Sequence, residues 1–113
     1  MQPPSKSEIQ LLHAQICQAL ADPTRIMLLY LLADASQNVG ELGAALHINQ
    51  PTVSRHLKVL RERGMVRSER TGTTVTYSLA DQRVIEALSI LRAVMTTDLL
   101  QKTALVNLLN QTG

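Results

Sequence analysis

Residues 39–79 constrain the fold of this 113-residue chain more than any other part of the sequence. A short apolar stretch at residues 41–46 is followed by a corner at His47-Ile48 and then by a longer, basic stretch with helical periodicity. Asn49 is a favourable N-cap for this longer stretch, and Gly64 lies where a left-handed residue commonly ends a helix. The sequence therefore predicts two helices joined by a tight corner.

Two short strands are expected directly after this pair of helices. Residues 65–70 and 73–79 are separated by a turn at Thr71-Gly72, and the second stretch is rich in Thr, Val and Tyr, which strands favour. A helix, a corner, a second helix and a two-stranded ribbon in this order predict a winged helix-turn-helix. Such a fold offers one helix to the major groove of DNA.

Two helices are expected before this unit. Ser7 is the expected N-cap of a helix at residues 7–20, and Asp22-Pro23 starts the next helix, with Asp as the N-cap and Pro in the first turn. Apolar residues of the first helix lie at near-helical spacing: Ile9, Leu12, Ile16 and Leu20. The second helix ends between residues 34 and 38 and is apolar nearly all round, which predicts a central, buried position for Ile26, Leu28, Leu29, Leu31 and Leu32.

Val39 is expected in a short strand before residues 41–46, and Asp81 is expected to cap a long final helix. The chain is therefore predicted to be mainly α with a small β-wing, in the order α-α-α-α-β-β-α. At this length, residues 1–113 are expected to form a single domain.

The helix after the corner has one apolar and one polar face. At about 100° per residue, Val53, Leu57 and Leu60 form a stripe that faces inward, and polar residues lie opposite. Gln50 can pair with adenine through two hydrogen bonds and Arg55 with guanine, while Thr52 and Ser54 can donate, accept or meet a thymine methyl. We expect these four residues to read bases.

Other polar residues suit the DNA backbone. Lys58 and Arg61 lie one to two turns further along and suit phosphates, and Arg67, Arg70 and Thr73 of the wing can reach a flanking backbone or the minor groove. His56 falls at the edge of the apolar stripe and is interpreted as a hydrogen-bonded or phosphate-contacting residue, not as a metal ligand.

Charge is distributed unevenly along the chain. Residues 50–83 hold seven Lys or Arg against three Asp or Glu, so this segment carries +4 and the rest −2 of the net charge of +2. A basic segment on an otherwise mildly acidic chain is typical of a nucleic-acid-binding face.

Composition excludes several other classes of protein. Cys17 is the single cysteine, so neither an intramolecular disulfide framework nor a cysteine-rich zinc module is expected. No stretch approaches the roughly 20 apolar residues of a membrane span, and the N-terminal residues lack the apolar core of a secretory signal. We therefore expect a cytoplasmic protein without a membrane partner. The three histidines lack patterned acids or nucleophiles and no glycine-rich phosphate loop occurs, so an enzyme and a bound cofactor are not expected.

Three runs of the chain resemble the ArsR/SmtB family of winged-helix repressors: ALADPTRIMLLYLL, VGELGAALHINQPTVSRHLKVLRERGMV and TVTYSLAD. The resemblance covers about residues 16–91 and implies a homodimer that binds an operator without inducer and releases it when an inducer binds. It implies DNA contacts from Gln50, Thr52, Ser54, Arg55 and His56, with support from Arg70 and Thr73 in the wing.

The metal sites of this family are not matched by the chain. Its Cys-x-Cys pair corresponds to Asn38 and Gly40. Its interfacial site of Asp, His, His and an acid corresponds to Asp81, Arg83, Val94 and Thr97. Arg, Val and Thr are not usual zinc ligands, so no metal is expected at these places.

Cys17 directly follows Ile16, in a place where the family commonly has a large apolar side chain. The first interpretation is therefore a buried, inert thiol. The alternative is a redox sensor in which the Cys17 thiols of two subunits oxidise across a dimer.

A dimer is also predicted from the final helix, whose apolar stripe is wider than one small domain needs. The resemblance implies that the first and last helices form the interface. Residues 7–20 and 81–111 are therefore the expected interface, with contacts from Ile9, Leu12, Ile16, Val84, Leu88, Leu91 and Met95. The sequence thus predicts a repressor of double-stranded DNA, bound as a homodimer to a pseudo-palindromic operator, with an unidentified inducer. A winged helix used as a protein-interaction module is the alternative function.

Overall fold

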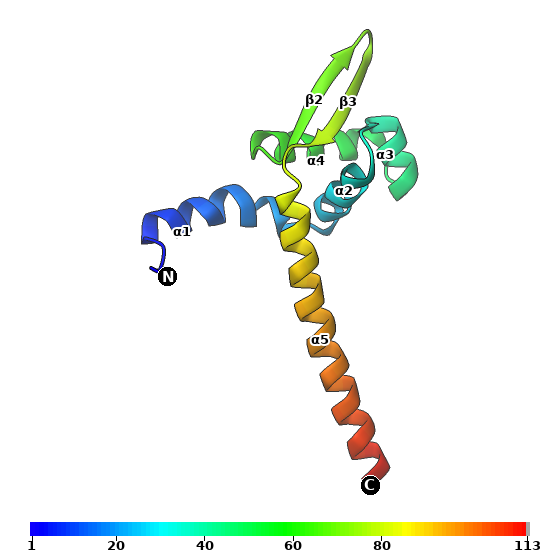
Figure 1. The fold of residues 1–113 in the computed structure, drawn as a ribbon. Coiled ribbons are helices and arrows are strands. Elements are labelled where there is room, and N and C mark those ends of the chain that lie inside the picture. Colours follow the sequence, from blue (N-terminus) through cyan, green and yellow to red (C-terminus); the bar gives the residue numbers. More distant parts are fainter. Residues whose placement is uncertain (113) are drawn as a thin grey trace. The chain divides into compact units, whose positions relative to one another are not determined.

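The computed structural model describes residues 1–112 and divides the chain into two compact units, residues 1–82 and the helix that follows them. Figure 1 shows the elements in chain order. They are α1 (Lys6–Leu12), a π-helical turn (His13–Cys17), a 3-10 turn (Ala19–Ala21), α2 (Pro23–Asp34), β1 (Gln37–Asn38), α3 (Val39–Leu46), α4 (Gln50–Glu62), β2 (Val66–Thr71), β3 (Thr74–Leu79) and α5 (Arg83–Thr112). The predicted winged helix-turn-helix, mainly α with a small β-wing, is confirmed.

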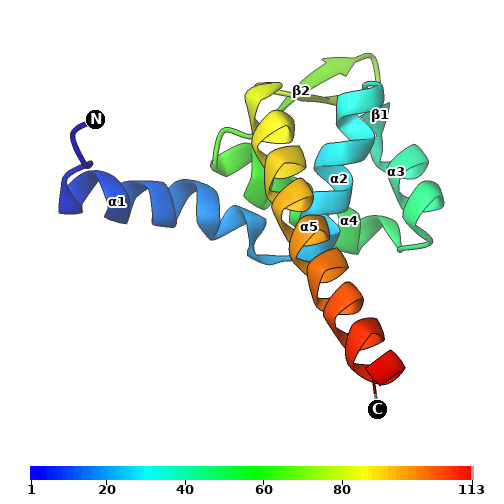
Figure 2. The same ribbon diagram turned by 60° about the horizontal axis from the view of Figure 1, so that its bottom comes forward.

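The core of residues 1–82 lies among α2, α3 and α4, which are packed side by side (Figure 2). The predicted inward stripe of α4 is confirmed, because Val53, Leu57 and Leu60 are fully buried. They share the core with Leu28, Leu29, Leu32, Leu42, Met65 and Val66. The remaining apolar residues expected at the centre of α2, Ile26 and Leu31, are half-buried.

Local capping chemistry sets the ends of these helices as the sequence predicts. The Asp22 carboxylate accepts hydrogen bonds from the backbone N–H groups of Thr24 (2.8 Å) and Arg25 (3.2 Å) at the start of α2. The Asn49 side chain accepts one from Thr52 N–H (2.9 Å) at the start of α4. Gly64 has φ 74° just beyond the end of α4, in the left-handed region that glycine adopts at little cost.

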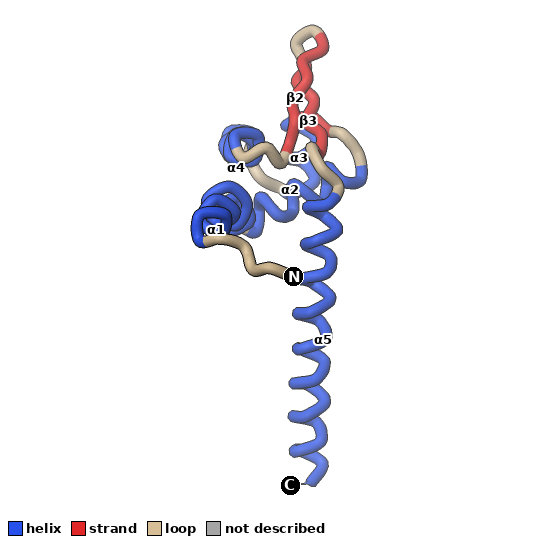
Figure 3. Tube along the Cα trace, turned by 60° about the vertical axis from the view of Figure 1, so that its left-hand side comes forward, coloured by secondary structure: helices blue, strands red, loops and turns tan. Residues whose placement is uncertain are grey.

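The wing is an antiparallel hairpin that extends beyond the helices (Figure 3). The strand order of the sheet is β1-β3-β2, and the register of the hairpin runs from Val66 opposite Leu79 to Thr71 opposite Thr74. A two-residue turn therefore joins the strands, and its first residue, Gly72, has φ 64°. Each strand begins one residue later than the sequence predicts.

Val39 is not in a strand, contrary to the prediction. The Asn38 side chain accepts a hydrogen bond from Glu41 N–H (2.8 Å), and the Glu41 carboxylate accepts one from Asn38 N–H (3.1 Å). This reciprocal capping box makes Val39 the first residue of α3. The strand before α3 is formed instead by Gln37 and Asn38, which pair with β3.

The single helix predicted at residues 7–20 is also wrong. The Ser5 hydroxyl, not that of Ser7, caps α1 by accepting a hydrogen bond from Glu8 N–H (3.2 Å). After Leu12 the chain widens into the π-helical turn, in which Gln18 N–H donates to His13 C=O (3.0 Å) across five residues. The extra residue in this turn changes the helical phase, so the apolar residues before and after it do not continue one α-helical stripe.

α5 is a single helix of 30 residues that begins at Arg83, so Gln82 and not Asp81 directly precedes it. As one helix, it holds no hydrophobic core of its own. Whether residues 1–113 act as one domain stays a prediction. No helix within residues 1–112 has the length and apolar character needed to cross a bilayer.

Candidate nucleic-acid interface

The polar side chains of α4 gather on one exposed face because the opposite face is fixed in the core. Four of the predicted DNA contacts on α4, Ser54, Arg55, Lys58 and Arg61, are exposed, as is Gln50 at its first residue. Thr52 and His56 are half-buried at the border between the two faces. The structure thus brings together the α4 residues that the sequence predicts as base and phosphate contacts.

Hydrogen bonds within the free protein position polar side chains at the start of α4. The Asn49 side chain occupies Thr52 N–H, and the Arg55 guanidinium donates through Nη2 to the Thr52 hydroxyl (3.1 Å). This hydrogen bond limits the rotamers of Arg55, so part of the entropy cost of positioning its guanidinium is met within the free protein. A planar guanidinium held at a helix start suits the paired acceptors on the major-groove edge of guanine.

The corner between α3 and α4 depends on a close approach of two backbone segments. Ile48 N–H donates to Gly43 C=O (3.0 Å), and a Cβ added at the buried Gly43 would lie 2.8 Å from Ile48 C=O. His47, with φ 56°, turns the chain between the helices. Sequence reasoning did not identify Gly43, although a glycine inside an apolar helical stretch is a recognised sign of close packing.

The wing does not bring its two predicted arginines together. Arg67 and Arg70 are both exposed on β2, but they are an odd number of residues apart, so their side chains leave opposite faces of the ribbon. Arg70 shares a face with Val66, and Thr73 is exposed in the turn. Arg67 and Arg70 therefore cannot contact DNA from the same face of the wing.

Arg25 is a residue near the interface that sequence reasoning missed. Its guanidinium donates through Nε to Ala19 C=O (2.8 Å) and through Nη2 to Gln18 C=O (3.1 Å), and Nη1 lies 3.4 Å from His56 Nδ1. The sequence feature that could have indicated Arg25 is a cation in the first turn of a mostly apolar helix.

The charges around Asp22 affect its ionisation. Desolvation by burial favours the neutral acid, but hydrogen bonds from the backbone N–H groups of Arg25 and Thr24 outweigh it, together with the charge of Arg25 and the electrostatic effect of His56 at the acidic pH where a carboxyl group titrates. The net effect holds the pKa of Asp22 below its usual value. The capping carboxylate is therefore ionised at neutral pH.

The structure describes each of the residues predicted at a dimer interface. Ile9 and Leu12 of α1 are about half exposed, at 46% and 48%, and Ile16 is half-buried. On α5, Val84 is half-buried, Leu88 is buried, and Leu91 and Met95 are exposed.

Cys17 is exposed, so the expectation of a buried thiol is wrong. The Cys17 side chain lies at the end of the π-helical turn, which is not covered by the core.

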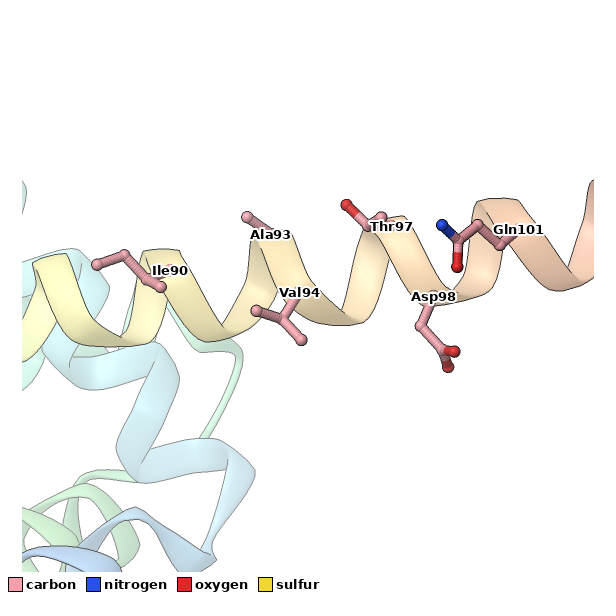
Figure 4. Close-up of a pocket in the computed structure, with 6 residues that line it drawn as sticks. All are labelled: Ile90, Ala93, Val94, Thr97, Asp98 and Gln101. Atoms are coloured by element: carbon pink, nitrogen blue, oxygen red, sulfur yellow. The ribbon is translucent and has the colours of Figure 1, made fainter. Parts of the chain in front are cut away.

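A shallow hollow follows the surface of α5, lined by Ile90, Ala93, Val94, Thr97, Asp98 and Gln101 (Figure 4). All six residues come from this one helix, so the hollow is a groove between neighbouring side chains and not an enclosed binding site. Asp98 is ion-paired with Lys102 at 3.0 Å. Residues 1–112 contain no cluster of three or more His, Cys, Asp or Glu side chains that could hold a metal ion.

The fold and the polar face of α4 define a winged helix-turn-helix of the DNA-binding class. The sequence model of the "Bacterial regulatory protein, arsR family" matches residues 22–68, which run from the cap of α2 into the wing. The chain belongs to the ArsR family of transcriptional regulators. This family consists of DNA-binding regulators and not of enzymes.

Two relatives and one solved structure illustrate the similarity. The transcriptional repressor SmtB of Mycobacterium tuberculosis is 42% identical over 81 residues, which are 72% of this chain and 60% of that repressor. The biofilm growth-associated repressor of Agrobacterium fabrum is 46% identical over 78 residues, 66% of this chain and 67% of that protein. A homodimeric winged helix-turn-helix DNA-binding domain of Mycobacterium bovis, solved in solution, is 30% identical, with a TM-score of 0.72 over 88% of this chain and 94% of that one.

Proposed function

We propose that this protein is a transcriptional repressor that binds a pseudo-palindromic operator as a homodimer and leaves it when a signal arrives. The observation that carries the proposal is the division of α4 into two faces. Val53, Leu57 and Leu60 are fully buried, and the exposed face is polar and basic from its first residue onward. A face of this kind, at the start of the second helix of the motif, suits the edges of bases in a major groove.

In this proposal the residues have separate roles. Gln50, Thr52, Ser54 and Arg55 contact base edges, while His56, Lys58 and Arg61 contact phosphates. Arg67, Arg70 and Thr73 supply backbone contacts from the wing, with Arg67 and Arg70 on different faces of it.

The homodimer is supported by the apolar surface of α5 and by the relative of known assembly. Ile90, Leu91, Val94 and Met95 are each more than half exposed, which is costly for a helix that meets only water. The domain of Mycobacterium bovis is homodimeric. Two copies related by a two-fold axis would place their α4 helices about 34–36 Å apart, one turn of DNA.

The signal is proposed to be something other than a metal at the known places of the family, because Asn38, Gly40, Arg83, Val94 and Thr97 supply no usual metal ligand there. A redox signal through Cys17 is a second candidate, favoured by the exposure of that thiol. In that case, an oxidant would take two electrons and two protons from the Cys17 thiols of two subunits as a disulfide forms. A regulator with Cys17→Ser that still responds in cells would eliminate the redox candidate.

The alternative of a protein-interaction module predicts a different surface on α4. A docking face would present contiguous apolar side chains, whereas the exposed positions of α4 are Gln, Pro, Ser, Arg, Lys and Glu. Within the described residues, the large apolar side chains that are exposed lie mostly on α5, with others on α1 and α2, and none of them is on α4.

Selection of bound duplexes from random DNA tests the proposal. The purified full chain should enrich an inverted repeat whose half-sites are about one helical turn apart, and sedimentation should show two chains per duplex. A lack of enrichment over random DNA, or one chain on an asymmetric site, would contradict it. Adding the selected site should protect the α4 side chains from chemical modification, whereas a protein-interaction module would show no such protection.

A further inference from the structure

Arg25 occupies a fixed position between the N-terminal segment and α4. Its backbone N–H donates to the Asp22 carboxylate, which sets the first turn of α2. Two of its guanidinium nitrogens donate to the carbonyls of Ala19 (2.8 Å) and Gln18 (3.1 Å), and Ala19 is fully buried. These contacts hold the backbone and two nitrogens of Arg25, so the direction of the remaining nitrogen, Nη1, is fixed as well.

That remaining nitrogen faces the imidazole of His56 at 3.4 Å. A guanidinium can only donate hydrogen bonds, so His56 Nδ1 must accept, and an accepting Nδ1 carries no proton. The proton of the neutral ring then lies on Nε2. The contact with Arg25 therefore selects one of the two tautomers of His56 and turns the other ring nitrogen into a donor.

The donor nitrogen of His56 is open to solvent. His56 is half-buried, and within residues 1–112 its Nε2 atom has no hydrogen-bond partner. No buried side-chain nitrogen or oxygen in the same part of the chain lacks a partner, so Nε2 reaches the surface. By helical geometry His56 lies about 60° from Val53, at the border between the core stripe and the polar face.

We propose that Arg25 is a positioning residue for DNA binding: it holds His56 as the Nε2–H tautomer, so that the imidazole donates a hydrogen bond to a phosphate of the DNA. This role rests on the proposed function. Arg25 does not contact the DNA itself but acts through His56. A neutral donor of this kind adds a contact to the backbone without adding a charge to the interface.

The salt dependence of DNA binding separates this role from a direct contact. Arg25→Met should weaken binding to the selected site about tenfold, the typical effect of losing one hydrogen bond to a charged group. The slope of log K against log salt should stay the same, since no cation leaves the interface. A slope smaller by about 0.9 would mean that Arg25 itself neutralises a phosphate, and would overturn the proposal.

Two substitutions of His56 supply the matched comparison. Glutamine offers an acceptor and a donor on one planar group, so His56→Gln should keep the affinity within about threefold of the wild type. His56→Leu should lose about tenfold. The double variant Arg25→Met/His56→Leu should bind no more weakly than either single variant, because both remove the same contact. Losses that multiply in the double variant would show that the two residues act independently.

The tautomer of His56 is measured directly by nitrogen-15 NMR of the full chain at pH 8. The wild type should show Nε2–H alone, and Arg25→Met should show a fraction of Nδ1–H. The same tautomer populations in both proteins would overturn the positioning role even if the affinities change.

If Arg25→Met does not fold, the wild-type tautomer and the comparison of His56→Gln with His56→Leu still decide the question: Nδ1–H in the wild type, or equal affinities for the two variants, would overturn it. Failure of the wild type to bind any duplex would instead end the proposed function, and the phosphate contact with it.

Discussion

At the scale of single residues, short-range chemistry explains much of this structure. Asp22 accepts two backbone hydrogen bonds at the start of α2, and Asn49 accepts one at the start of α4. Both follow from residue type and position, so the sequence alone predicts them. Arg25 could not be predicted in this way, because its partner His56 lies 31 residues further along the chain and only the packing of α2 on α4 brings them together.

We expect Asp22→Ala to lower the free energy of unfolding by about 1 kcal/mol at pH 7, measured by urea denaturation, because α2 loses its cap. Asp22→Asn keeps a side-chain acceptor and should lose less than half of that. Equal losses for the two variants would show that the charge of Asp22, and not the acceptor, stabilises α2.

The stability of the wild type should also depend on the ionisation of Asp22. Its pKa is held below the usual value in the folded protein, so the contribution of the ionised form is complete above the unfolded-state pKa of about 3.9. It is lost as the pH falls through the lower, folded-state pKa. The difference in stability between the wild type and Asp22→Asn should therefore be constant from pH 5 to 7 and disappear in stronger acid.

Lys58 is expected to contribute to affinity without contributing to sequence preference. Lys58→Ala should weaken binding to specific and random DNA by similar factors and lower the salt slope by about one, because one phosphate contact is lost. Lys6→Ala removes the same charge from exposed α1 and should leave the slope unchanged. A reduced slope for Lys6→Ala, or an unreduced one for Lys58→Ala, would refute the assignment of the phosphate contact.

At the scale of elements, the sequence predicts the regular parts well and the irregular ones poorly. The helix-corner-helix and the wing follow from periodicity and turn residues, and their bounds agree with the structure to within a residue or two. The N-terminal segment differs because a π-helical turn leaves no mark in the apolar spacing that separates it from a continuous helix. Its start was nevertheless readable, since Ser5 and Glu8 have the spacing of a capping box.

The corner between α3 and α4 is expected to tolerate no side chain at Gly43. Gly43→Ala should destabilise the fold by about 1–3 kcal/mol, as overpacking does, because the added Cβ would lie 2.8 Å from the Ile48 carbonyl oxygen. Gly40→Ala is the control in the same helix, since its nearest atoms, at 3.3 and 3.6 Å, belong to side chains and not to the backbone, so the added Cβ needs a shift of only a few tenths of an ångström. Thermal unfolding of both variants measures the difference; an equal or larger loss for Gly40→Ala would contradict it.

At the scale of the whole molecule, the sequence predicts DNA binding much better than it predicts the signal that ends it. The residues proposed to contact DNA lie mostly within α4, close together in the sequence, and each has a side chain whose chemistry suits a base edge or a phosphate. The sequence does not identify the signal, because the positions that bind metals in the ArsR/SmtB family hold other residues here, and the exposed Cys17 is a single thiol. The sequence predicts assembly in part: it shows the apolar stripe of α5, but it does not show which surface covers that stripe.

The proposed dimer gives α5 a testable role. Leu91→Glu places a charge on the exposed apolar stripe and should convert the dimer to a monomer in sedimentation, with loss of binding to the inverted repeat. Thr96→Glu adds the same charge to the same helix away from that stripe and should leave the dimer intact. A Leu91→Glu protein that remains dimeric would remove this face from the interface.

The central claim is that the start of α4 reads sequence, and Arg55→Ala tests it most directly. The measurement is the ratio of affinities for the selected site and for random DNA of equal length, in the wild type and in the variant at one salt concentration. We expect the variant to lose about 1–3 kcal/mol of this preference while its binding to random DNA changes little. Equal losses on both DNAs would contradict the account, because Arg55 would then hold the backbone and not a base.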